Sequence, residues 1–138
     1  MSATTTVDRP IDIAAFEAGS FDPSAFDHPA HVRVAWSYLQ QCELGEAIRR
    51  FTRALHALTV RLDITGKYHE TITWFFIIAI AERIARDPDA DWESFRRRNP
   101  DLFRGGNLLR RHYSAERLRS PLARRQFLLP DLPSPGQG

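Results

Sequence analysis

An apolar run at residues 74–81 is the feature that most constrains how this chain can fold. The run reads WFFIIAIA and directly follows a polar cluster, KYHETIT, at residues 67–73. It lacks the two-residue alternation of a half-buried strand, and its neighbours have helical spacing. A helix that is apolar on every face is typical of the middle of a bundle. We therefore predict a helix over about residues 67–86, stopped by Asp87-Pro88-Asp89.

Two further long helices are predicted before this one, from apolar residues that recur at helical spacing. The first covers about residues 28–42, where Asp27 is a good N-cap and Pro29 suits the first turn. The second covers about residues 46–62, with Gly45 as the break between them. If these helices run up, down and up, the first and third are parallel and their N-termini lie at one end of the bundle.

The remaining segments are short and rich in turn-forming residues. Residues 11–18 and 91–98 can each form a short helix, and Ser114 and Ser120 resemble helix starts. The predicted fold is therefore all-α: a single-domain helical bundle of three long helices plus short C-terminal helices. The predicted organisation is a disordered N-terminus at 1–10, one helical domain at 11–129 and an extended Pro-rich tail at 130–138.

Composition narrows the class of protein. The longest apolar run is far shorter than the ~20 residues that span a bilayer, and the polar first residues lack the apolar core of a secretory signal. One cysteine cannot form an internal disulfide, so we expect a cytoplasmic protein. The net charge is only +2, the arginines are interspersed with acids, and no nucleic-acid reader motif is present, which argues against nucleic-acid binding.

Three histidines form the candidate site. His28 and His31 are three residues apart and share one helix face. His69 lies near the start of the third long helix, at the same end of the predicted bundle. Three imidazoles with open positions suit a transition metal such as Zn, Fe or Cu. We therefore predict a small cytoplasmic enzyme that acts on a small molecule, with His28, His31 and His69 as metal ligands.

Residues beside these histidines supply the other predicted roles. Lys67 is the one lysine of the chain, and it stands next to Tyr68 and close to Glu70. These three are the predicted catalytic residues, because each can exchange a proton or contact a substrate. Arg33 and Thr73 are the predicted substrate-binding residues.

Other interpretations of the same residues remain open. A metal-free pocket could use His31 or His69 as a general base, or could only bind a ligand, as a regulatory protein does. The histidines could also be purely structural, with His28 as a helix cap. A third hypothesis makes the Pro-rich tail and the arginine faces a protein-interaction module. A homodimer is also left open, although no apolar stripe remains unassigned for its interface.

Four segments of the chain resemble a family of small helical bacterial proteins without an assigned activity. They are FDHPAHVRVAWSYL, KYHETITWFF, NPDLFRGGNLLRRHYS and SPLARRQFLLPDLP. Family members read approximately F-x-H-x-x-H-(L/V)-R-V-A-W, then K-Y-H-E-T-I-T, then (R/H)-Y-Y-S. The chain has His112 before Tyr113 where the family pattern has two tyrosines, so a ligand role for His112 does not carry over. The resemblance implies that the two histidine-bearing motifs belong to one pattern.

Overall fold

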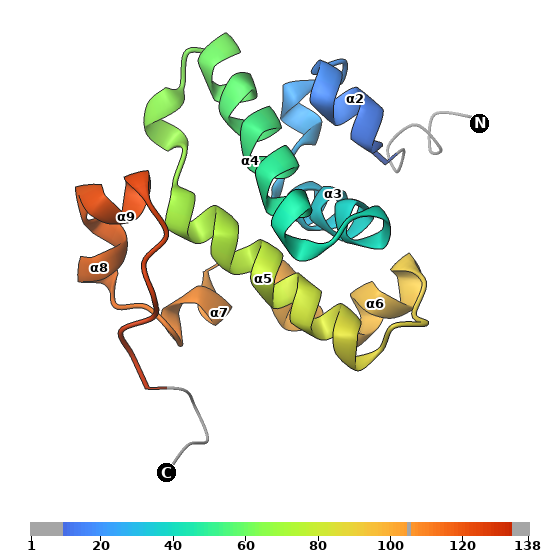
Figure 1. Cartoon of the computed structure of the whole chain (residues 1–138). Helices are drawn as coiled ribbons and strands as arrows, with labels where there is room; N and C mark the ends of the chain where they lie inside the picture. The colour runs from blue at the N-terminus through green and yellow to red at the C-terminus, as the bar shows by residue number, and fades with distance from the viewer. Residues whose placement is uncertain (1–9, 105, 134–138) are drawn as a thin grey trace.

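The predicted all-α class is confirmed in the part of the chain that the structure describes. A computed structural model of the protein describes residues 10–104 and 106–133, and these residues form helices and no strand (Figure 1). None of the helices in these two ranges has the length and apolarity that crossing a membrane requires. The predictions for residues 1–9 and for the end of the tail, 134–138, lie outside the described residues.

Eight α-helices and three short 3-10 helices follow one another along the described residues. The α-helices are α2 (Ile13–Ala18), α3 (His28–Gln41), α4 (Leu44–Arg61), α5 (Glu70–Arg86), α6 (Trp92–Arg98), α7 (Asn107–Arg110), α8 (Ala115–Arg119) and α9 (Pro121–Arg125). The 3-10 helices are η1 (Pro23–Ala25), η2 (Thr65–Lys67) and η3 (Pro100–Phe103).

Several predicted helix starts are confirmed by their caps. The Asp27 carboxylate accepts the Ala30 backbone N–H at 3.0 Å and so caps α3. Ser114 and Ser120 cap α8 and α9 in the same way. A side-chain oxygen at the N-cap satisfies one of the backbone donors that a helix start leaves unpaired, so these residues fix where the helices begin.

Two predicted boundaries are wrong. Helix α4 begins two residues early, at Leu44, because the Ala47 N–H donates to the Glu43 carbonyl and takes Gly45 into the first turn. Helix α5 begins at Glu70 instead of at about residue 67. Lys67 ends the η2 turn, and Tyr68 and His69 are extended. The first three residues of the polar cluster therefore lie before the helix and the other four form its first turn, so its side chains point in different directions.

Helix α5 lies at the centre of the molecule, as the apolar run predicts. In Figure 1 it crosses the view with α2, α3 and α4 on one side and α7, α8 and α9 on the other. It packs against α3, α4 and α9, and α3 and α4 also pack against each other. Phe75, Ile77 and Ile80 are buried, whereas Trp74 and Phe76 are half-buried at the flanks. Burial of these side chains supplies the main stabilisation of α5.

The C-terminal segment is held against the start of α5. The buried Thr71 hydroxyl bonds the carbonyls of Ala123 at 2.7 Å and Gln126 at 2.8 Å, and it accepts the Leu128 N–H at 3.1 Å. The Tyr113 hydroxyl donates to the Leu128 carbonyl at 2.6 Å. The apolar start of the tail therefore lies against the body of the protein.

Candidate functional site

A cavity of about 480 Å³ lies between α3, α4 and the start of α5. Its floor is buried and apolar and includes Val32, Ala35 and Phe51. Its mouth is formed by exposed residues, among them Pro23 and Lys67. Concave, mostly apolar sites with a few polar groups are typical of small-molecule binding, and this volume falls in their usual range of roughly 300–1,000 Å³.

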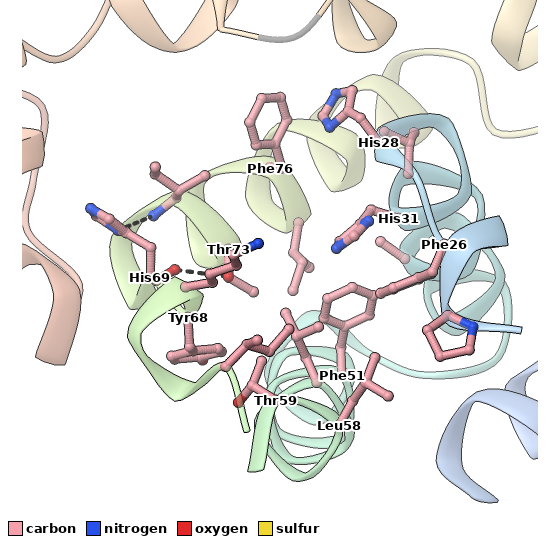
Figure 2. Close-up of a pocket in the computed structure, with 18 of the residues that line it drawn as sticks. Phe26, His28, His31, Phe51, Leu58, Thr59, Tyr68, His69, Thr73 and Phe76 are labelled. Carbon is pink, nitrogen blue, oxygen red and sulfur yellow. Dashed lines mark hydrogen bonds between the residues drawn. The ribbon is translucent and has the colours of Figure 1, made fainter. Parts of the chain in front are cut away.

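All three predicted histidines line this cavity, but each contacts a different part of the chain. His28 Nε2 lies 2.8 Å from the Leu102 carbonyl oxygen. His31 Nδ1 lies 2.9 Å from the Asp27 carbonyl oxygen, and His69 Nε2 lies 2.7 Å from that of Leu118. In Figure 2 the His31 ring is turned into the cavity beside Phe26, whereas His28 and His69 lie at its edges. The fold thus brings the three histidines to one cavity without aiming them at one point.

His69 is the N-cap of α5, a role that was not predicted for it. Its Nδ1 accepts the Ile72 backbone N–H at 3.2 Å. Nε2 must then carry the proton, and it donates to Leu118. Both ring nitrogens are engaged, so neither has a lone pair free for a metal ion. In the described ranges no three His, Cys, Asp or Glu side chains are grouped to hold a metal, and metal binding stays a prediction.

His31 is the histidine whose imidazole ring points into the cavity. A carbonyl oxygen can only accept, so His31 Nδ1 donates to Asp27 and Nε2 is the acceptor in the neutral ring. The ring stacks on Phe26 with centroids 3.8 Å apart and planes 20° apart. Burial lowers the pKa of His31 below its ordinary value of 6.5, against the opposing hydrogen bond to Asp27. At neutral pH the cavity therefore contains a fixed imidazole acceptor.

The lowered pKa of His31 predicts a loss of stability in acid. Between the native pKa and the ordinary 6.5, the unfolded chain binds a proton that the native chain does not. The contribution of His31 to the free energy of unfolding is then at its maximum above about pH 6.5. It falls as the pH decreases below this value, with a slope of at most about 1.4 kcal/mol per pH unit. Urea unfolding from pH 7.5 to pH 5 should show a shallower pH dependence in His31→Phe than in the wild type. Equal slopes would contradict the lowered pKa.

Three other predicted site residues also line the cavity. Lys67 is exposed at its mouth. The Thr73 hydroxyl donates to the His69 carbonyl at 2.8 Å, which leaves its oxygen as an acceptor. The Tyr68 hydroxyl donates to the Glu70 carboxylate, and burial together with that carboxylate raises the pKa of Tyr68 far above its ordinary value. Tyr68 is therefore a neutral residue in the wall.

Two predicted residues lie elsewhere. The Arg33 guanidinium stands over the Trp92 ring, 5.0 Å from its centroid, and is not among the cavity residues. Glu70 lines a separate groove on the other side of Tyr68. The structure thus brings His31, Lys67 and Thr73 together and separates Arg33 and Glu70 from them.

Sequence reasoning missed Phe26 as a site residue. The signal was present, because Phe26 is the first letter of the F-x-H-x-x-H motif that contains His28 and His31. The stacking of Phe26 on His31 explains why an aromatic residue suits that position. Thr59 in the cavity wall carried no such signal, since its hydroxyl bonds the His56 carbonyl of its own helix.

Comparisons with protein-family models, with curated proteins and with solved structures find no match to this chain. The motif resemblance described above stays a prediction, and the function is argued from the cavity itself.

Proposed function

We propose that this protein binds a small, largely apolar carboxylic acid that carries a hydroxyl group, inside the cavity between α3, α4 and α5. The observation that carries the proposal is the neutral His31 ring, held with Nδ1 on the Asp27 carbonyl so that Nε2 presents a lone pair to an apolar cavity. A half-buried acceptor that faces an apolar cavity selects a ligand with a hydrogen-bond donor, because an unpaired polar group in an apolar site costs free energy.

A positive charge at the mouth of the cavity selects a ligand whose other end is an acid group. Lys67 is the one lysine of the chain, and it lines the mouth without a carboxylate within 4 Å in the described part of the chain. Its ammonium group can meet a carboxylate while the apolar body of the ligand is buried against the floor. The ligand thus enters with its hydroxyl-bearing part toward His31 and its acid group toward solvent.

Ligand binding can be measured by displacement of anilinonaphthalene sulfonate, a fluorescent apolar anion. We expect decanoate and 10-hydroxydecanoate to displace it, with decanol weaker. Ala35→Phe fills the cavity from its buried floor and should weaken all of these ligands about tenfold or more without a loss of stability, because its ring enters empty space. Ala57→Phe, at an exposed position of α4, is the matched control and should bind as the wild type does.

Two further variants separate the roles of the polar groups. Lys67→Met should abolish the preference for decanoate over decanol. His31→Phe, which keeps an aromatic ring against Phe26, should abolish the preference for the hydroxylated acid over decanoate. If Ala35→Phe binds the probe as tightly as Ala57→Phe, the ligand does not occupy this cavity and the proposal fails.

A transition-metal enzyme is the second candidate, and His28 and His31 carry it. They are three residues apart on α3 and line the same cavity, and within the described residues each has one ring nitrogen without a hydrogen-bond partner. Zn²⁺, Fe²⁺ or Cu²⁺ would need His69 to leave its cap or a ligand from the substrate. Elemental analysis of untagged protein tests it. Stoichiometric metal that is lost in His31→Phe would favour the enzyme over simple binding.

The wider setting of the site belongs to the same proposal. We take the three helices of 14, 18 and 17 residues, α3, α4 and α5, as one bundle that frames the cavity. We place the protein in the cytoplasm and treat its ligand as an intracellular metabolite. A homodimer and a protein-interaction role for the Pro-rich tail are kept as the alternatives to this role.

A further inference from the structure

A second hollow lies next to the cavity, on the outer side of Tyr68. It is a groove of about 680 Å³ between α4, the η2 turn and α9. Helix α4 and helix α9 both pack against α5, and the groove separates them. Positive side chains from both walls line it: Arg49 and Arg53 from α4, and Arg124 and Arg125 from α9.

The four arginines of this groove form no ion pair with an acidic side chain of the described residues. Elsewhere the chain pairs arginine with carboxylate, as in Arg83 with Asp101 at 2.7 Å and Arg50 with Glu17 at 2.9 Å. Across the described residues, no carboxylate lies within 4 Å of a guanidinium of the groove. Glu70 lines the groove as well, but its carboxylate accepts the Tyr68 hydroxyl. The groove is therefore a concave surface with an excess of positive charge.

The backbone fixes the positions of the two walls. Arg49 and Arg53 are four residues apart and share one face of α4 with His56. Arg124 is held by a 2.7 Å bond from its Nη1 to the Gly66 carbonyl. Because this bond joins α9 to the η2 turn, the second wall is set in place before any ligand binds, which lowers the cost of ordering it.

We propose that this groove binds a diphosphate group, either as free pyrophosphate or as part of a phosphate ester. Four arginine cations less one Glu70 carboxylate leave three positive charges. A diphosphate carries about three negative charges near neutral pH, whereas a single phosphate group carries roughly two at most. Guanidinium groups form paired, charge-assisted hydrogen bonds to phosphate oxygens, and two facing walls can bind both phosphates.

The groove favours a small anion over a nucleic-acid strand. Its arginines face a hollow between two helices, whereas a polymer needs a longer stripe of positive charge along its path. The other arginine cluster, at Arg96, Arg97 and Arg98, lies on α6, and Arg98 pairs with Asp87 at 2.5 Å. None of these three arginines lines the groove.

Isothermal titration with sodium pyrophosphate, phosphate and adenosine diphosphate tests the proposal. The titration is made in about 0.1 M salt, where exposed charges beyond ~10 Å are screened. We expect pyrophosphate to bind and phosphate to bind at least about tenfold more weakly. The double variant Arg53→Gln/Arg125→Gln spares the Arg124 bond to Gly66 and should weaken pyrophosphate binding about tenfold or more. If adenosine diphosphate binds more tightly than pyrophosphate, the physiological source is an ester.

The matched control is Arg86→Gln/Arg97→Gln, which removes the same two charges at exposed positions outside the groove. It should bind pyrophosphate within about twofold of the wild type, and thermal melting should show that both double variants fold. Equal weakening in the two double variants, no binding by the wild type, or tighter binding of a single-stranded oligonucleotide would each overturn the proposal. Ala35→Phe should leave pyrophosphate binding unchanged, so this site and the cavity are tested separately.

Discussion

Replacement of His69 by alanine is expected to lower the free energy of unfolding by about 2–4 kcal/mol. The variant loses the cap at Ile72 and leaves both that N–H and the Leu118 carbonyl without their partner. Loss of an N-cap costs ~1 kcal/mol, and a buried group left unpaired costs about 1–3 kcal/mol more. Urea unfolding followed by circular dichroism measures the change.

Two controls separate these contributions. His69→Asn can still accept the Ile72 N–H but cannot reach Leu118, so it should recover only the ~1 kcal/mol of the cap. His56→Ala, at an exposed histidine of α4, should change stability by no more than about 0.5 kcal/mol. If His69→Ala is as stable as the wild type but no longer binds metal, His69 is a ligand and its assignment as a cap is wrong.

Thr71→Val is the second substitution with a large expected effect, about 2–4 kcal/mol of lost stability. Valine has nearly the same shape, so the packing of this fully buried side chain is kept. The substitution leaves the carbonyls of Ala123 and Gln126 and the Leu128 N–H without their common partner. Unfolding in urea measures the stability, and hydrogen exchange should show earlier opening of α9 than of α4.

Thr59→Val is the matched control for this prediction. Thr59 is also buried, but its hydroxyl donates only to the His56 carbonyl within the same helix. Its replacement should cost less than about 1 kcal/mol, because the His56 carbonyl can still accept a backbone hydrogen bond within the helix. Similar losses in the two variants would mean that the hydroxyl of Thr71 does not hold the C-terminal segment in place.

The helices were predictable where a side chain marks their start. Asp27, Ser114 and Ser120 are strong N-cap residues, and the boundaries they predict are confirmed. The start of α5 was not predictable, because histidine is not a preferred cap. His69 caps α5 with its ring fixed by a carbonyl 49 residues away. The identity of a backbone acceptor leaves no trace in a sequence, since every residue carries the same carbonyl group.

The candidate site was predictable as a location and not as a geometry. The order of the long helices brought His28, His31 and His69 to one cavity, as expected from their positions in the sequence. Ring direction depends on the acceptors that tertiary packing supplies, Leu102 for His28 and Leu118 for His69. The cavity was also invisible from the sequence, because an unfilled volume results from how side chains pack and not from which ones are present.

The bonds from His69 and Thr71 to residues 118–128 have a consequence for biosynthesis. During translation α3, α4 and α5 emerge from the ribosome well before the carbonyls that these two side chains require. Until that last segment is made, the start of α5 has donors and acceptors that only water can satisfy. The nascent chain therefore fixes the start of α5, which borders the cavity, only near the end of its synthesis, and premature termination would leave a collapsed but unfinished chain for the quality-control machinery of the cell.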